Sequence, residues 1–257
     1  MSRRIALAMA FVVATVALGT AAQAAPGSDV VQVNVAGQGT TIYGVLEGLP
    51  SLGGSSGYYA GRGPAAEITS YYSSGQYAAD QASVAAAAQA FLTSWTKAHC
   101  TSVTNCAGKK AAAVFDIDDT LTSSYAALRA HGFTAGPAYD RAIENCTTPA
   151  IAPVVSFVNF VKSEGIAFYL ITGRPDTARA LTAACMRKIG VSGWSRLVMR
   201  TPAQLSLTAQ QYKSAARAQI QRSGFTIITS IGDQVSDSAG GSTQRGFLLP
   251  NPMYYIP

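Results

Sequence analysis

Three carboxylates follow directly on an apolar run in the segment VFDIDDTLTSSY, residues 114–125. Asp116, Asp118 and Asp119 crowd the end of what reads as a buried strand, where like charges repel one another and resist desolvation, so a cation or a bound proton is needed there. In an extended chain Asp116 and Asp118 point to the same side, whereas Asp119 points away. We therefore expect Asp116 and Asp118 to face a functional site, and Asp119 to serve as a cap or an ion-pair partner.

Two later segments also end an apolar run in polar residues. They are IAFYLITGR, residues 166–174, and FTIITSIGDQVSD, residues 225–237. Their polar positions are Thr172, Gly173, Arg174, Asp233 and Asp237. In an open parallel sheet, ligands bind beyond the carboxyl ends of the strands, where the strand order reverses, so one crevice can collect all of these groups. The oxygen-rich set predicts a site for a divalent ion, Mg²⁺ in particular.

This set of groups suits phosphoryl transfer. With Mg²⁺ holding phosphate oxygens, Asp116 can act as the nucleophile, which splits the displacement into an aspartyl-phosphate step and its hydrolysis. A neighbouring negative charge raises the proton affinity of Asp118, which suits it to protonate the leaving oxygen. Lys213, in the helix-forming segment LTAQQYKSAARAQIQ, could add a second positive charge against the phosphoryl group. Taken alone it reads as a surface lysine, which makes it the least specific of these candidates.

The elements that must position these residues alternate regularly beyond residue 110. Unbroken apolar runs predict strands over residues 111–117, 166–172, 196–200 and 225–232, with a last apolar run at 246–250. Helical spacing of apolar residues and suitable start and stop residues predict helices over 77–97, 153–165, 175–190 and 207–224. This alternation predicts an α/β fold, a Rossmann-like parallel sheet sandwiched by helices.

The first residues read as a secretory signal peptide, residues 1–24. Arg3 and Arg4 precede an apolar stretch, and Ala22-Gln23-Ala24 has the small-x-small pattern of a cleavage site. The strongly apolar part falls short of the roughly 20 residues that a membrane-spanning helix needs, so we expect a secreted protein, extracellular or periplasmic, with no membrane partner after cleavage. Residues 25–75 are expected to form a loose leader rich in Gly, Ser and Tyr, and residues 76–257 the main domain.

The charge of the chain is mildly basic. Residues 1–24 hold two of the 19 basic residues and none of the 13 acidic ones, so the mature chain has a formal charge of +4. No Lys/Arg cluster accompanies this charge, which argues against a nucleic-acid partner, although a small anionic substrate would still be attracted.

The four cysteines predict two disulfides once the chain is exported to an oxidising compartment. The short loop CTSVTNC makes Cys100–Cys106 the easiest pairing and leaves Cys146–Cys185, although sequence alone leaves the connectivity open. The spacings match no usual zinc pattern.

Taken together, the motifs resemble those of the haloacid dehalogenase superfamily. DIDDT at 116–120 matches its DxDxT motif, LITGR at 170–174 its second motif, Lys213 its third and GDQVSD at 232–237 its fourth. More narrowly, FDIDDTLTSSY, ITGRP, YKSAAR, IGDQVSD and LPNPMYYIP resemble the secreted acid phosphatase branch, which includes plant acid phosphatases and vegetative storage proteins. The resemblance runs from about residue 70 to the end of the sequence.

This resemblance implies a role for each site residue. Asp116 would be the nucleophile and a Mg²⁺ ligand, and Asp118 the acid/base with its backbone carbonyl on the metal. Asp233 would be the third protein ligand, with Asp237 in support of the metal. The phosphoryl group would be held by Thr172, with Gly173 beside it, and by Lys213.

The resemblance also implies a small cap, roughly residues 122–152, between the first two core strands. The expected substrate is a small phosphate monoester, and the expected activity that of an acid phosphatase. Phosphotransfer to acceptors other than water stays open. The other alternative is a non-catalytic storage or binding protein on the same scaffold, against which the presence of Asp116 and Asp118 argues, because such a protein has no need of them.

Overall fold

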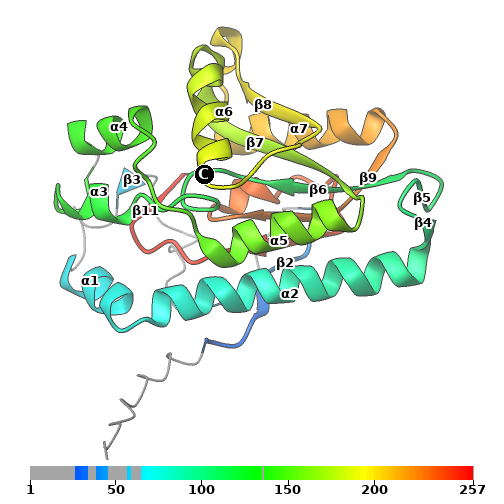
Figure 1. The fold of residues 1–257 in the computed structure, drawn as a ribbon, viewed down its shortest axis with the longest axis horizontal. Coiled ribbons are helices and arrows are strands. Elements are labelled where there is room, and N and C mark those ends of the chain that lie inside the picture. Colours follow the sequence, from blue (N-terminus) through cyan, green and yellow to red (C-terminus); the bar gives the residue numbers. More distant parts are fainter. Residues whose placement is uncertain (1–26, 34–38, 46–56, 59–64, 135, 257) are drawn as a thin grey trace, which may run out of the picture.

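The computed structural model describes residues 27–33, 39–45, 57–58, 65–134 and 136–256. A seven-stranded sheet with the order β1-β2-β10-β9-β6-β7-β8 forms its centre (Figure 1). Strands β2 to β8 in this order run parallel, and only β1 is antiparallel to its neighbour. The strands are β1 Val31–Val33, β2 Ile42–Gly44, β6 Lys110–Phe115, β7 Ala167–Pro175, β8 Arg196–Arg200, β9 Phe225–Gly232 and β10 Arg245–Leu248.

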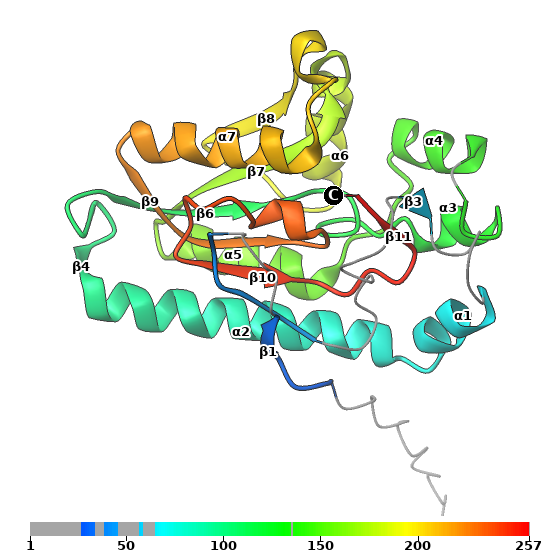
Figure 2. The same cartoon turned by 180° about the vertical axis from the view of Figure 1, so that it is seen from behind.

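Helices cover both faces of this sheet. Helices α2 (Gln76–His99), α5 (Ala152–Ser163) and α6 (Arg179–Lys188) contribute to the larger apolar core on one face. Helix α7 (Ala209–Arg222) covers the other face, on the opposite side of the sheet from α2 (Figure 2). Strand β6 serves both cores, since Ala113 and Phe115 pack into the first and Ala112 and Val114 into the second. This two-sided burial explains why β6 reads as an unbroken apolar run, and it confirms the Rossmann-like sandwich.

The predicted elements and the observed ones agree closely. Strands β8 and β9 have the predicted bounds, and the helix predicted over 77–97 is α2. The helix predicted over 175–190 begins instead with a 3₁₀ turn, η1 (Asp176–Ala178), because β7 continues to Pro175. A second 3₁₀ turn, η2 (Pro202–Gln204), follows β8, and a third, η3 (Val235–Asp237), follows β9.

Part of the predicted leader belongs to the sheet. Strands β1 and β2 both lie between residues 25 and 75, and β2 pairs in parallel with β10. Ile42 and Val45 are buried, at 1% and 0% exposure. Helix α1 (Ala65–Ser73) follows in the same stretch and contacts α2. The expectation that this stretch lacks core elements is therefore wrong for its described parts. Three-residue strands are too short to show an alternating pattern in a Gly/Ser-rich segment.

The expected cap lies between β6 and β7. It contains helices α3 (Tyr125–Arg129) and α4 (Pro137–Glu144), which gather at one end of the sheet near α1 (Figure 1). Next to them, β3 (Gly57–Tyr58) pairs antiparallel with β11 (Tyr254–Tyr255). The cap therefore stands beside the carboxyl end of β6.

Both disulfides have the connectivity favoured by the sequence. Cys100–Cys106 joins the strands of a small hairpin, β4 (Cys100–Ser102) and β5 (Asn105–Cys106). Cys146–Cys185 ties the end of the cap to α6. None of the helices described here has the length and apolar character to span a bilayer. The predicted signal peptide, residues 1–24, lies outside the described residues.

Candidate active site

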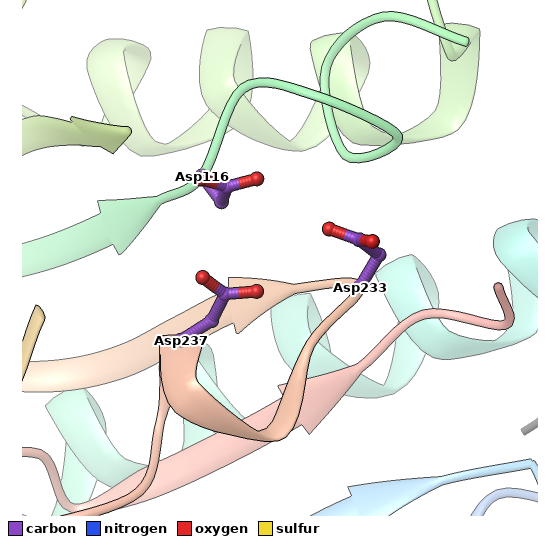
Figure 3. Close-up of side chains that lie close together, drawn as sticks. All are labelled: Asp116, Asp233 and Asp237. Carbon is purple, nitrogen blue, oxygen red and sulfur yellow. The ribbon is translucent and has the colours of Figure 1, made fainter. Parts of the chain in front are cut away.

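Strand β6 lies at the point where the strand order reverses. Its neighbours are β7 on one side and β9 on the other, and all three run parallel. Their carboxyl ends therefore meet at one edge of the sheet, where Asp116 follows β6 and Asp233 follows β9. Asp237, at the end of η3, returns to the same place (Figure 3). The fold thus gathers carboxylates from segments more than a hundred residues apart in the sequence.

The three carboxylates form a compact buried cluster. Asp116, Asp233 and Asp237 are 5%, 1% and 3% exposed. One oxygen from each lies within 4.8 Å of the others, and the side chains face one another (Figure 3). Lys213 reaches the cluster from the first turns of α7, donating from Nζ to Asp116 Oδ1 at 2.8 Å and to Asp237 Oδ1. The sequence had marked Lys213 as its least specific candidate, and the structure places it in direct contact with Asp116.

This cluster has more negative than positive charge. Lys213 supplies one cation against three buried carboxylates. Burial raises the pKa of Asp116 to about 7, opposed by Lys213 and assisted by Asp237 and Asp118. Burial, with Asp237, Asp116 and Asp119 nearby, also raises the pKa of Asp233 well above its usual range. A divalent cation would remove this imbalance, and carboxylate oxygens are ligands that suit Mg²⁺. The residues present therefore fit a hard metal ion.

Neutral donors hold Asp233 in place. Its Oδ2 accepts hydrogen bonds from Gln234 Nε2 at 2.5 Å and from Asn251 Nδ2 at 2.6 Å. Its Oδ1 accepts a longer bond, 3.3 Å, from Thr120 Oγ1, which also reaches Asp116 Oδ2 at 3.4 Å. Amide and hydroxyl donors orient the carboxylate without cancelling its charge. Oδ2 is therefore occupied by two amides, while Oδ1 is the more available oxygen for a cation.

Asp118 lies beside this cluster and is paired with Arg174. The guanidinium donates from Nη2 to Asp118 Oδ1 at 2.6 Å and from Nε to Oδ2 at 2.9 Å. Thr172, fully buried, donates weakly to Asp118 Oδ2 at 3.5 Å and accepts from the Arg174 backbone amide. From the sequence, only a neighbouring negative charge is expected at Asp118. Arg174 is visible in the ITGR segment, but its pairing with Asp118 is not.

Asp119 makes its hydrogen bonds outside the carboxylate cluster, but strand alternation is not the reason, because β6 ends at Phe115 and Asp119 lies in a turn with a φ of 51°. Its oxygens accept from the backbone amide of Ser124 at 2.8 Å, from the Ser124 hydroxyl, and from Tyr254 Oη at 2.7 Å. Burial raises the pKa of Asp119 to about 6, opposed by these hydrogen bonds. Asp119 thus ties Ser124, which precedes α3, to the segment that contains β11, and among the described residues it forms no ion pair.

The turn that contains Asp237 depends on close packing. Gly232 ends β9, and a Cβ at this position would collide with the Asp237 carboxylate. Arg217, on α7 and fully buried, donates to the backbone carbonyls of Ser236 and Asp237. Burial lowers the pKa of Arg217 to about 10. The glycine in GDQVSD is therefore required for steric reasons by the acid five residues later.

A cavity of about 460 Å³ opens above this cluster. Asp116, Asp118, Lys213 and Asp233 line its floor, and Tyr139 and Ile143 come from α4 of the cap. The rest of its wall is Gly173, Arg174, Pro175, Ala178, Arg200, Ala209, Gln234, Ser236, Tyr254 and Ile256. Of the predicted site residues, Thr172 and Asp237 are not part of this lining and lie behind it.

Sequence reasoning gave no role to Asn251 or Arg200, although the segment that contains Asn251 was part of the resemblance. Asn251 lies in the terminal segment LPNPMYYIP and reaches the site only through the fold. Arg200 ends β8, beyond β7, and would have been found by extending the strand-tip rule to one more strand.

The chain is similar in sequence to known proteins. The sequence profile of the HAD superfamily, subfamily IIIB (acid phosphatase), matches residues 62–257. Acid phosphatase 1 of Solanum lycopersicum is 34% identical over 148 residues, which cover 56% of this chain and 58% of that protein. Vegetative storage protein 1 of Arabidopsis thaliana is 32% identical over 149 residues, 56% of this chain and 55% of that protein. The chain therefore matches less than two thirds of the length of these relatives.

The fold also has a solved counterpart. The class C acid phosphatase from Bacillus anthracis superposes with a TM-score of 0.60 at 17% sequence identity, over 74% of this chain and 86% of that one. At this identity the likeness concerns the fold alone. The profile match, which extends from before α1 to the end of the sequence, decides the relationship: this chain belongs to the HAD superfamily, subfamily IIIB, the acid phosphatase subfamily.

Proposed function

We propose that this protein is a secreted, Mg²⁺-dependent acid phosphatase that hydrolyses small phosphate monoesters through an aspartyl-phosphate intermediate. The observation that carries the proposal is a buried cluster of side chains beneath an open cavity. The cluster consists of Asp116, Asp233, Asp237 and Lys213. A cluster with this excess of negative charge is costly unless a cation completes it. Membership of an acid phosphatase subfamily supports the same conclusion.

Asp116, Asp233 and Asp237 would hold the metal ion, whose chemistry is to neutralise the charge of the phosphate oxygens. Lys213 and the Gly173 backbone bind and orient the phosphoryl group from the cavity wall. Thr172, behind the wall, acts through Asp118 and the Arg174 amide.

Asp116 supplies the nucleophile. Its carboxylate oxygen forms a bond to phosphorus while the bond from phosphorus to the ester oxygen breaks, and the departing oxygen takes a proton from Asp118. Asp118 then accepts a proton from water, and that water oxygen attacks the phosphorus of the aspartyl-phosphate. The products are inorganic phosphate, the alcohol and the regenerated Asp116 carboxylate.

The Arg174 ion pair restricts how Asp118 can act. Both oxygens of Asp118 are held by the guanidinium, so one of them must leave Arg174 to meet the oxygen of a leaving group. The side chain of Asp118 is 21% exposed on the cavity side, which gives it room to do so. In this mechanism Arg174 orients Asp118 between catalytic cycles.

Turnover of p-nitrophenyl phosphate tests the proposal. With Mg²⁺ present, we expect phosphate release at mildly acidic to neutral pH, and a fall of about a hundredfold or more after treatment with EDTA. Added Mg²⁺ should restore the rate. Absence of turnover by the metal-loaded protein across this pH range would contradict the phosphatase assignment.

A storage or binding role is the second candidate, because a vegetative storage protein is among the relatives at 32% identity. The retained Asp116 and Asp118 favour the enzyme over this reading, since binding alone does not require a nucleophile beside a general acid.

Adding a simple alcohol to the phosphatase assay separates hydrolysis from phosphotransfer, because transfer would yield the alkyl phosphate in place of inorganic phosphate.

Asn251 is proposed to position the metal ligand Asp233. Replacement of Asn251 by alanine removes one of the two amides that hold Asp233 Oδ2, and should weaken Mg²⁺ binding by about tenfold or more. Titration calorimetry with Mg²⁺ measures this directly, without reference to turnover. Asn105→Ala, on the exposed hairpin, is the control. Unchanged Mg²⁺ affinity in Asn251→Ala would contradict the positioning role.

A further inference from the structure

Arg200 stands on the cavity wall two strands away from Asp116. It ends β8, whose register places it opposite Pro175 at the end of β7, and β7 in turn neighbours β6. Gly173, Arg174 and Pro175 line the cavity between them. Since neighbouring strands lie about 4.8 Å apart, β6 and β8 are roughly 10 Å apart across the sheet. Phe115 pairs with Leu170 whereas Arg200 pairs with Pro175, so Arg200 also stands farther along the strand direction than Asp116. Arg200 therefore faces a different part of the cavity from Asp116.

The Arg200 side chain is held in place without being neutralised. Its Nη1 donates to the Leu207 carbonyl at 3.0 Å, and its guanidinium lies 5.1 Å from the centre of the Tyr212 ring. Its Nε is buried and has no hydrogen-bond acceptor among the residues described. One carbonyl and one aromatic ring thus fix the group. The buried Nε is closed to a ligand, whereas Nη2 is not buried and has no acceptor among the described residues.

The other two cations on this wall are already paired. Lys213 bonds to Asp116 and Asp237, and Arg174 bonds to Asp118 through its Nε and Nη2. Arg200 forms no ion pair within the described part of the chain. Guanidinium groups bind carboxylates and phosphates through charge-assisted hydrogen bonds, and Nη2 is the nitrogen of Arg200 that stays open for one. The cavity therefore has one fixed positive charge left for a ligand.

We propose that Arg200 forms a subsite for a second anionic oxygen group, a carboxylate or a phosphate, on the alcohol part of the substrate. This inference rests on the proposed phosphatase function and specifies its substrate class. Strand spacing sets the separation of the two anionic groups, so that a rigid or extended linker is favoured over a short one. Tyr139 and Ile143 on the cap wall provide contact surface for the linker.

A matched pair of aryl phosphates tests the subsite. 4-Carboxyphenyl phosphate has a carboxylate on the ring side opposite the reacting group, and its methyl ester has the same ring without that charge. The wild-type protein should prefer the acid by about tenfold in kcat/KM, mostly through KM, because a charged hydrogen-bonded pair contributes to binding throughout the reaction. The 2-carboxyphenyl isomer, with a short separation, should lose this preference. 1,4-Phenylene bisphosphate serves as the phosphate arm.

Arg200→Gln should abolish the preference for the carboxylic acid substrate over its methyl ester, and should leave turnover of the methyl ester within about twofold of wild type. Arg200→Lys should keep part of the preference for the acid. Arg196→Gln, at the exposed start of the same strand, is the control and should behave as wild type. Equal rates for acid and ester in the wild-type protein, or an equal loss for both in Arg200→Gln, would overturn the subsite.

Binding measurements separate this inference from the proposed function. Titration calorimetry on Asp116→Asn compares the acid with the ester in the absence of turnover, alone and combined with Arg200→Gln. A binding preference for the acid that Arg200→Gln removes supports the subsite even if no aryl phosphate is hydrolysed by the wild-type protein, in which case only the phosphatase assignment fails. Absence of that preference in binding would overturn the subsite.

Discussion

Asp116→Asn is expected to lose at least about a thousandfold in kcat on p-nitrophenyl phosphate. An amide oxygen cannot form the phosphoryl-enzyme bond, and no other described carboxylate both lines the cavity and bonds directly to Lys213. The substitution keeps the size of the side chain, and Lys213 keeps its second partner, Asp237. Thermal unfolding should therefore remain cooperative, with a midpoint within a few degrees of wild type.

Two measurements decide this prediction. Circular dichroism on heating establishes that the variant is folded, and acid quenching with labelled substrate detects the phosphoryl-enzyme in wild type and its absence in Asp116→Asn. A folded variant that keeps half of the wild-type activity would show that another residue is the nucleophile.

Lys213→Met is expected to change stability, turnover and metal affinity in different directions. Without Lys213 the three buried carboxylates lose the one residue that forms ion pairs with them in the described part of the chain, and breaking a buried ion pair costs about 3–5 kcal/mol of unfolding free energy in the metal-free protein. Turnover should fall by about a hundredfold or more, because the charge facing the phosphoryl group is lost. Mg²⁺ affinity should rise, because the ion no longer competes with an ammonium group for Asp116 and Asp237.

Chemical denaturation with and without Mg²⁺ measures the loss of unfolding free energy in the metal-free variant and the stabilisation that Mg²⁺ binding restores. The loss should be largest with EDTA and shrink as Mg²⁺ is added, and the double variant Lys213→Met/Asp237→Asn should recover part of it. Lys162→Met, on the exposed side of α5, should show none of these changes. A Lys213→Met protein with wild-type stability in EDTA would contradict the buried ion-pair network.

The sequence predicted the site residues correctly where an apolar run, read as a strand, ended in polar residues. Such runs are long enough in β6, β7 and β9 to be read directly, and one rule of parallel sheets brings their ends together. That is why Asp116, Asp118 and Asp233 could be grouped before any coordinates were known. Lys213 followed from the family motif rather than from any local pattern, because its role depends on how α7 packs over the sheet.

Long-range partners were less accessible to sequence reasoning. β1 and β2 have three residues each, so their place in the sheet comes from pairing with β10 and not from their own periodicity. Asn251 and Asp233 are joined across 18 residues by a single amide. Arg174 was visible at the strand tip, but its hold on Asp118 depends on side-chain direction, which spacing in sequence does not specify.

If the protein has the proposed function, the Cys146–Cys185 bridge would make substrate choice a property acquired during maturation. Helix α4 supplies Tyr139 and Ile143 to the wall of the cavity. The disulfide joins the end of the cap to α6, and Lys188 Nζ adds a hydrogen bond of 2.9 Å to the Cys146 carbonyl. The metal-ligand cluster, by contrast, involves no cysteine. A newly made, unoxidised chain would thus already possess its reactive centre while the wall that selects among esters was still without its covalent tether.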